Sequence, residues 1–484
     1  MTRHSVSVSL LGALTALTLY RGLTLYYAGP PLDVEEAYYF AWSRHLDVGY
    51  YSKPPMIAWL IRFATALCGD SEFCLRLPAL LLYPAAVWFV FLTARRLFDK
   101  RIGVIAAISF ATLPMVTASS WLITTDVPLI FFWSAGLYFF VRALAENRWS
   151  DWLAMGAATG LGLMSKFTMA LFGVGVLACL VVDGSARAHL GNPRSYAALF
   201  IAVLILLPNI VWNAAHDFPT VRHTAELAQL NRDLVHPLHL LGFIAGQFAV
   251  FGPVLLALWA VLSAGVREGF TDARQRVLVF FAAPLLLLMT VLSLLSRAHL
   301  NWAAPAYVAA AISVAALALP RRPRWLAAAV AVNLIAAPLI YHHRELLIAA
   351  GADDSARTDA FYRSRGWQEL ALAVGTYIQA WPSARLLADD RYTLAELVYY
   401  LKPRRDDAIW NPSGAITDQF RMSADIAARP HGEFVFVARD AKLEDIAPCF
   451  AHARALGEIR IVVYPDLVRR YRLYYVADFR GYRR

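Results

Sequence analysis

The stretch that decides the fold is residues 33–59, DVEEAYYFAWSRHLDVGYYSKPPMIAW, which follows the first apolar segment of the chain. It combines the acids Asp33, Glu35 and Glu36, a group of tyrosines, and a Lys-Pro-Pro turn that begins at Lys53. Acids and a lysine beside an apolar segment are needed neither for folding nor for membrane insertion. We therefore interpret this stretch as the centre of a site to which other segments contribute.

The composition of the whole chain indicates a membrane protein. Of its 484 residues, 59% are hydrophobic and only 17% are charged, whereas soluble domains carry about 25% charged residues. The formal net charge of +10 comes from arginines in short loops, which set the topology of membrane proteins. No soluble stretch forms a basic face, so we expect the lipid bilayer as a partner and no nucleic acid.

The apolar segments predict a polytopic α-helical protein. A helix that crosses a bilayer needs about 20 mainly apolar residues, and on this basis we expect about eleven transmembrane helices. They are expected at residues 5–27, 75–98, 102–119, 127–144, 152–165, 167–182, 196–212, 238–262, 277–295, 303–319 and 325–341. Residues 55–67 are apolar but too short to cross, so we expect them to lie along the membrane surface.

The loops between these segments differ in charge. Arginine-rich short loops, such as those at Arg95 and Arg321, are expected in the cytoplasm. The longer, more acidic loops then face the opposite, outer side of the membrane. We expect a transmembrane domain at 1–343, with a first outer loop at 28–74, and a soluble outer domain at 344–484.

The soluble domain is predicted to be α/β. Helical patterns at 367–381 and 391–401 alternate with strand-like runs, and this alternation is typical of a small α/β domain. The strand-like runs are 385–388, 433–437, 459–464 and 471–476. Earlier in the chain, Cys68 and Cys74 lie close together in the first outer loop, where an oxidising compartment permits a disulfide.

Two kinds of side chain in the first loop suggest chemistry. Asp33 or Glu35 is suited to take a proton from an acceptor hydroxyl, although acids also suit the N-terminus of a helix. Lys53 is suited to hold a phosphate, although a lysine beside a membrane also extends toward lipid headgroups. Further polar residues fall on the same face of the membrane: Asp126, Lys166, His216, Arg297, His299 and Asn301.

The chemistry that these groups allow is the transfer of a group from an anionic carrier. Acids activate a nucleophile, cations stabilise a leaving phosphate, and aromatic rings stack on a sugar or a prenyl chain. Asp126 is equally suited to cap a helix. Two lone histidines without cysteines or suitably spaced acids do not indicate a metal site, and we expect no metal and no other cofactor.

Three motifs resemble a known family. The stretch from residue 33 to residue 62, LITTDVPLIFFW around Asp126, and GLMSKFTMAL around Lys166 are similar to polyprenyl-phosphate-sugar-dependent membrane glycosyltransferases of the C-type fold. This superfamily includes the lipid A aminoarabinose transferases, lipopolysaccharide glycosyltransferases and protein O-mannosyltransferases. The resemblance covers the first 170 residues, and its first-loop motif does not specify the sugar.

The resemblance implies a catalytic transmembrane domain that carries out inverting transfer from an undecaprenyl-type phosphate sugar on the periplasmic face of a bacterial inner membrane, which makes the outer loop and the outer domain periplasmic. We expect lipid A or another lipopolysaccharide part as the acceptor. The family's acidic pair aligns with Glu35 and Glu36, so that the catalytic carboxylate is Glu35 or Asp33. Lys53, Lys166 and Arg297 are expected to bind the donor phosphate. The expected substrate-binding residues are Glu36, Tyr38, Tyr39, Tyr51, Asp126, His216, His299 and Asn301.

Two other functions remain open from the sequence. One is a protein O-glycosyltransferase of the same fold, and the other is a flippase or transporter for polyprenyl-linked sugars. A transporter requires polar residues at mid-membrane depth, whereas this sequence gathers them on one face and adds a soluble domain. The enzyme is therefore the favoured interpretation.

Overall fold

The computed structural model describes residues 3–228, 235–264 and 272–482. They form two compact units, each built from segments that are separate in the sequence. Unit 1 consists of Met1–Gly29, Lys53–Leu60 and Phe73–Tyr341, and unit 2 of Pro30–Ser52, Ile61–Glu72 and His342–Arg484. The first loop is therefore divided: its acidic part belongs to unit 2, and the Lys53 turn belongs to unit 1.

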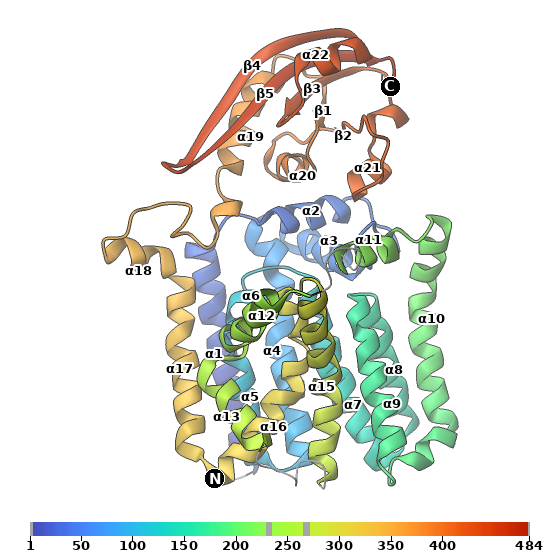
Figure 1. Cartoon of the computed structure of the whole chain (residues 1–484), viewed down its shortest axis with the longest axis vertical. Coiled ribbons are helices and arrows are strands. Elements are labelled where there is room, and N and C mark those ends of the chain that lie inside the picture. The colour runs from blue at the N-terminus through green and yellow to red at the C-terminus, as the bar shows by residue number, and fades with distance from the viewer. Residues whose placement is uncertain (1–2, 229–234, 265–271, 483–484) are drawn as a thin grey trace. The chain divides into compact units, whose positions relative to one another are not determined.

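Helices occupy all the apolar segments expected to span a membrane (Figure 1). They are α1 (Arg3–Ala28), α4 (Glu72–Leu97), α5 (Lys100–Ala111), α6 (Pro114–Ser119), α7 (Asp126–Glu146), α8 (Trp149–Leu163), α9 (Ala170–Val182), α10 (Pro193–Ala215), α12 (Pro237–Phe251), α13 (Pro253–Ala264), α15 (Ala273–Leu295), α16 (Ala306–Arg321) and α17 (Pro323–Tyr341). The segment expected along the membrane surface is α3 (Met56–Cys68), and α11 (Pro219–Ala228) follows α10.

The expected number of spans is not confirmed. Among the described residues, six helices are long and apolar enough to cross a membrane, or seven if the bent pair α12 and α13 forms one span. Helices α5, α8, α9 and α16 are each shorter than the roughly 17 residues that a crossing needs. The predicted class, a polytopic α-helical membrane protein, is confirmed.

Two segments expected to be single helices are broken. In the segment 102–119, α5 ends at Ala111 and α6 begins at Pro114, because proline is tolerated in a first turn but not in a helix interior. In the segment 238–262, α12 and α13 meet at an angle of 108°. Gly252 lies between them with φ +91°, a conformation that favours glycine, and Pro253 starts α13.

Small residues allow close helix packing in unit 1. A Cβ atom on Gly156 of α8 would lie 2.3 Å from the carbonyl oxygen of Ala198 in α10, and one on Gly160 would lie 3.0 Å from that of Ala202. Small residues at such spacing let helix backbones approach each other in membranes. Figure 1 shows α8 beside α10.

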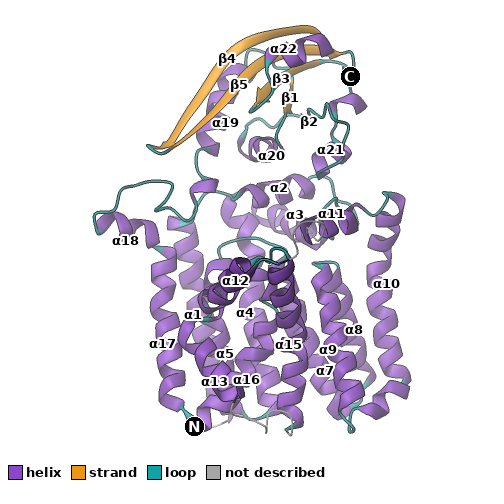
Figure 2. Ribbon diagram, viewed as in Figure 1, coloured by secondary structure: helices purple, strands orange, loops and turns teal. Residues whose placement is uncertain are grey.

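Unit 2 contains a five-stranded sheet, and Figure 2 shows that the strands are confined to the C-terminal part of the chain. The strands are β1 (Arg385–Ala388), β2 (Asp407–Ile409), β3 (Glu433–Ala438), β4 (Phe450–Tyr464) and β5 (Leu467–Phe479), in the order β2-β1-β3-β5-β4. β1 pairs in parallel with β2 and β3, and β5 runs antiparallel to β3 and β4. Its helices are α2 (Val34–Ser43), α18 (His343–Ala349), α19 (Trp367–Ile378), α20 (Arg391–Tyr400), α21 (Gln419–Ser423) and α22 (Leu443–Ile446).

The predicted C-terminal α/β domain is therefore present, with differences in its strands. β4 begins at Phe450, nine residues before the predicted start, β5 extends beyond the predicted 471–476 at both ends, and β2 was not predicted. Side chains such as Phe434, Phe436 and Trp410 form the core beneath the sheet. Cys68 and Cys74 are both disulfide-bonded, which agrees with the disulfide that an oxidising compartment permits, whereas Cys179 and Cys449 are buried free thiols.

Candidate active site

The Lys53 turn is fastened to the end of α8. Two prolines follow Lys53 and restrict the backbone, because their rings lock φ. The N–H of Met56, the first residue of α3, donates to the carbonyl of Met164 at 3.0 Å. Lys166 follows Met164 by two residues, so the two predicted lysine turns lie next to each other in unit 1.

A buried ion pair joins the second lysine turn to the start of α7. Lys166 Nζ donates to Asp126 Oδ1 at 2.7 Å, and the two side chains are 13% and 7% exposed. Asp126 Oδ2 accepts a hydrogen bond from Asn301 Nδ2 at 2.5 Å. The N-cap of α7 is Thr125, so Asp126 does not cap the helix and instead ties three loops together.

Three cations act on one histidine in the loop between α15 and α16. Partial burial lowers the pKa of His299, and Arg297, Lys166 and Lys53 lower it further. Nearby positive charges have this effect because they disfavour a protonated imidazole. The charges of Arg297, Lys166 and Lys53, the three cations predicted to bind the donor phosphate, thus all act on His299 in unit 1.

His216 has a different environment. It follows α10, stacks on Trp212 with ring centroids 4.3 Å apart, and places Nδ1 2.8 Å from the Trp212 carbonyl oxygen. These contacts close the end of the helix, and its predicted substrate-binding role stays a prediction. Within the described ranges, no group of three or more His, Cys, Asp or Glu side chains is placed to hold a metal ion.

The acids of the first loop begin α2 in unit 2. Asp33 is the N-cap: Asp33 Oδ1 accepts from the N–H of Glu35, and Glu36 Oε2 accepts from the N–H of Asp33, each at 3.0 Å. This reciprocal arrangement is a capping box. Burial raises the pKa of Asp33, and the nearby charge of Glu36 adds to that effect. Asp33 and Glu36 thus both stabilise the helix start.

Glu35 takes no part in the capping box through its side chain. Its side chain is 40% exposed, and Glu35 Oε1 lies 3.5 Å from Arg391 Nη2. The hydroxyl of Tyr392 donates to the same oxygen at 3.3 Å. Of the three acids, Glu35 is therefore the one whose carboxylate remains accessible and is oriented by side chains rather than by the helix end.

The predicted tyrosines pack in the core of unit 2. Tyr38, Tyr39 and Tyr51 are 1%, 6% and 5% exposed. The hydroxyl of Tyr38 accepts from the N–H of Gln419 at 2.5 Å, and the N–H of Tyr51 donates to Gln419 Oε1 at 2.7 Å. These residues hold the first loop against α21, and their predicted contact with substrate stays a prediction.

Sequence reasoning did not identify the partners of these acids in α20. Arg391 and Tyr392, which contact Glu35, lie more than 350 residues away in the chain, and no local pattern links such distant positions. Glu396 is fully buried, and its carboxylate has no hydrogen-bond partner among the described residues. Burial, reinforced by the charge of Asp33, raises the pKa of Glu396 well above its ordinary value.

Comparisons with known proteins identify relatives of the chain. Residues 52–212 match the family described as dolichyl-phosphate-mannose-protein mannosyltransferase. Over 422 residues, the chain is 33% identical to the lipid A galacturonosyltransferase RgtD of Rhizobium johnstonii, covering 85% of this chain and 88% of that protein. It is 31% identical over 183 residues to the lipopolysaccharide core galacturonosyltransferase RgtA of the same organism, covering 37% of each.

A solved structure shows the same fold. The crystal structure of ArnT from Cupriavidus metallidurans bound to undecaprenyl phosphate matches 98% of both chains, with a TM-score of 0.64 and 15% identity. The long match to RgtD establishes the family, and Lys53, Asp126 and Lys166 all lie within residues 52–212, which match the family model. The chain therefore belongs to the polyprenyl-phosphate-sugar-dependent C-type membrane glycosyltransferases and is itself a glycosyltransferase.

Proposed function

We propose that this enzyme transfers a sugar, with inversion, from an undecaprenyl-type phosphate donor to lipid A or another lipopolysaccharide acceptor. The observation that carries the proposal is the joining of the Lys53 turn to the turn of Lys166 by the bond from Met56 to Met164, with the charges of Lys53, Lys166 and Arg297 all acting on His299. When the bond between the sugar and the phosphate breaks, the leaving polyprenyl phosphate gains negative charge. Fixed cations stabilise that charge more in the transition state than in the bound donor.

Each cation has a distinct part in this proposal. Lys166 is held in place by Asp126, whose second oxygen is engaged by Asn301. Asp126 is therefore a positioning residue, and its occupied oxygens make it a poor base. Lys53 is fixed by its prolines and by the bond of Met56 to Met164, and it supplies positive charge to the departing phosphate together with Arg297.

The acceptor attacks the sugar in a single displacement. The acceptor oxygen forms a bond to the anomeric carbon from the face opposite the phosphate, the bond from that carbon to the phosphate oxygen breaks, and polyprenyl phosphate leaves. If the acceptor is a hydroxyl, its proton passes to a carboxylate. We assign this role to Glu35, because the side chains of Asp33 and Glu36 already form the capping box, and we keep Asp33 as the alternative.

The names of the relatives support a choice of sugar and acceptor. RgtD is named as a lipid A galacturonosyltransferase and RgtA as a lipopolysaccharide core galacturonosyltransferase, which supports a hexuronic acid as the donor sugar. The match to RgtD spans most of the chain, whereas the protein mannosyltransferase family matches residues 52–212 alone. We therefore favour a lipid A acceptor over a protein acceptor.

We further propose that the site faces the periplasm from the inner membrane. Residues 1–343 form the membrane-embedded catalytic domain, which includes the first loop at 28–74, and residues 344–484 form the periplasmic domain that helps to receive the acceptor. The support is the charge of the loops, since arginine-rich short loops stay in the cytoplasm. A glycosyltransferase of this kind requires its lipid-linked donor and its lipid acceptor on the same face.

Lipid A from cells with and without the gene provides the test in cells. Mass spectrometry is expected to show a species heavier by one hexuronic acid residue that disappears on deletion and returns on complementation. Complementation with a Lys53→Ala variant that is present in the membrane at normal levels is expected not to restore it. Identical lipid A and lipopolysaccharide in all strains would contradict the proposal.

A further inference from the structure

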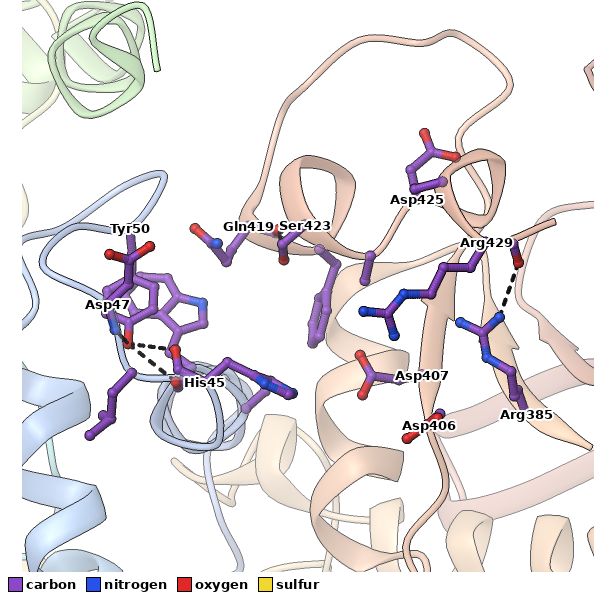
Figure 3. A pocket seen from close by; sticks show the side chains of 16 residues that line it. His45, Asp47, Tyr50, Arg385, Asp406, Asp407, Gln419, Ser423, Asp425 and Arg429 are labelled. Atoms are coloured by element: carbon purple, nitrogen blue, oxygen red, sulfur yellow. Dashed lines mark hydrogen bonds between the residues drawn. The ribbon is translucent and has the colours of Figure 1, made fainter. Parts of the chain in front are cut away.

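Two cavities outside the candidate site differ in what lines them. The cavity in Figure 3, at the end of α2 in unit 2, has a lining that mixes arginines such as Arg385 with aspartates such as Asp406 and Asp407. A lining of mixed charge favours no single class of ligand. The other cavity lies within unit 1, has a volume of about 330 Å³ and is bordered by α8, α9 and α10. We refer to it as the α8–α10 groove.

The α8–α10 groove is apolar and accessible from outside the protein. Its lining includes Leu177 of α9 and Leu199 of α10, whose side chains are 57% and 61% exposed. The hydroxyl groups of Thr159, Ser195 and Tyr196 also line it, and each donates to a backbone carbonyl, at 2.9, 2.7 and 2.6 Å. These hydroxyl groups are satisfied without a ligand, so the groove is suited to a hydrocarbon chain rather than to a sugar.

The groove extends from the arginine-rich end of unit 1 into the membrane-spanning region. Ser195 lines it near the start of α10, and Ala202 lines it two turns further on, about 10 Å deeper at 1.5 Å per residue. Helix α10 is long and apolar enough to cross a membrane. Tyr196, beside Ser195, has an exposed ring, and tyrosine favours the membrane–water interface. The headgroup of a lipid whose chain lies in the groove is therefore expected beside the start of α10.

Two arginines near the start of α10 have no acidic partner among the described residues. Arg194, next to Ser195, places its guanidinium over the ring of Trp149, with Cζ 5.6 Å from the ring centroid, and such a contact holds a cation in place. Arg187 begins the short 3-10 helix before α10 and donates to the carbonyl of Val181 at 2.9 Å. Their positive charges are not balanced by a neighbouring carboxylate, so this end of the groove favours an anionic headgroup.

We propose that the α8–α10 groove binds an anionic phospholipid of the membrane, with one acyl chain along its apolar walls and the phosphate held by Arg194 and Arg187. Basic pockets between transmembrane helices bind anionic lipid headgroups in this way. The inference goes beyond the proposed function and does not depend on it, because neither Lys53 nor Lys166 lines the groove. Polyprenyl phosphate, the carrier of the donor sugar, is also an anionic lipid, so the test must distinguish the two lipids.

The first test concerns the headgroup. Native mass spectrometry of the delipidated full-length protein in detergent would compare phosphatidylglycerol with phosphatidylcholine of the same acyl chains, and we expect phosphatidylglycerol to bind more tightly. Arg194→Gln should weaken the binding of phosphatidylglycerol about fivefold, the usual effect of one arginine beside an anionic lipid surface, and leave that of phosphatidylcholine unchanged. Arg101→Gln is the matched control and should change neither, because Arg101 is an exposed arginine of α5, which Figure 1 shows apart from α10.

The second test fills the groove. Gly173 of α9 lines it, and a Cβ atom there would meet no atom within 4 Å, so Gly173→Leu fits without strain and occupies the space of the acyl chain. This variant should weaken the binding of both phospholipids. Gly12→Leu is its control, because Gly12 of α1 has equally open surroundings and does not line the groove.

Three outcomes would overturn the proposal. The first is equal binding of phosphatidylglycerol and phosphatidylcholine to the unchanged protein. The second is unchanged binding of phosphatidylglycerol in either Arg194→Gln or Gly173→Leu. The third is loss of polyprenyl phosphate binding in Gly173→Leu, which would assign the groove to the donor lipid instead; we expect this binding to be unchanged. Because no sugar transfer is measured, a failure here leaves the proposed function untouched.

Discussion

At the scale of single residues, Glu35 and Asp33 differ in what their oxygens already do. Asp33 caps α2, whereas Glu35 is partly exposed beside Arg391 and Tyr392. If the acceptor is a hydroxyl, Glu35→Gln should lower kcat by a factor on the order of 10²–10⁴, the usual contribution of a general base. Asp33→Asn should retain most activity, because asparagine is also a good N-cap.

Both variants are to be assayed with a lipid-linked donor after a check of thermal stability. A severe loss in Asp33→Asn with normal folding would transfer the catalytic role to Asp33. Full activity in both variants would mean that the nucleophile needs no base, as for a lipid A phosphate that is already an anion. In that case neither acid acts as the base.

His299 reports the charge of the cation cluster directly. Because Lys53 contributes to its lowered pKa, Lys53→Met should raise the pKa of His299 toward its ordinary value. The measurement is an NMR titration of labelled histidine, with the signal assigned from His299→Gln. Lys442→Met, at an exposed lysine of unit 2, should leave the titration unchanged. If the pKa of His299 were unchanged in Lys53→Met, the charge of Lys53 would not act on His299.

The sign of the linked stability follows from the same shift. A histidine with a lowered pKa in the folded protein resists protonation there more than in the unfolded chain. At neutral pH the imidazole is neutral in both states, so the shift costs no stability. As the pH drops below the ordinary pKa of histidine toward the lower pKa in the folded protein, the unfolded chain binds the proton first and the free energy of unfolding falls.

At the scale of secondary-structure elements, the ion pair of Asp126 and Lys166 joins α7 to the turn after α8. Asp126→Asn leaves the Lys166 charge buried without its partner, and breaking a buried pair in this way costs about 3–5 kcal/mol. The double variant Asp126→Asn/Lys166→Met should be less destabilised than Asp126→Asn alone. Thermal unfolding in detergent measures both.

A surface ion pair serves as the control. Asp272 and Arg274 are bonded at 2.8 Å, but their side chains are 31% and 53% exposed. Asp272→Asn should therefore change the stability by at most about 1 kcal/mol. Equal destabilisation by Asp126→Asn and Asp272→Asn would remove the structural role given to Asp126.

Elements were predicted well where the pattern is local. Apolar runs located α4, α7, α10 and α15, and alternation located β1, β3 and β5, because burial imposes these periods on the sequence. β2 escaped detection because it is three residues long and begins with Asp407. The bend at Gly252 was not predicted either, because a straight helix and a bent one produce the same apolar run in the sequence.

The site was predicted only in part, because only its local sequence patterns could be recognised. The lysines and Asp126 stand in local motifs, so their residue types could be recognised. That Lys166 pairs with Asp126, 40 residues away, and that Glu35 meets Arg391 of α20, depend on tertiary contacts. Such contacts leave no periodic signal in a single sequence.

At the scale of the whole molecule, orientation in the membrane is the next prediction. The test introduces one cysteine on each side of the membrane. Leu372→Cys places it at an exposed position of α19, and Gly191→Cys places it in the short loop before α10, with open space around it. An impermeant maleimide should label the first and not the second in intact spheroplasts. The natural cysteines give little background, because they are buried or disulfide-bonded. The reverse labelling would place the site in the cytoplasm.

The most direct measurement is sugar transfer by the purified protein. The enzyme in nanodiscs would receive polyprenyl-phosphate-linked galacturonic acid and lipid A, and mass spectrometry would follow both lipids. We predict lipid A heavier by one hexuronic acid residue, equimolar polyprenyl phosphate, and a rate reduced about 10²–10³-fold in Lys53→Ala by loss of a charge-stabilising group, with partial recovery in Lys53→Arg. Unmodified lipid A after long incubation with folded enzyme, or equal rates in the unchanged protein and Lys53→Ala, would contradict the account.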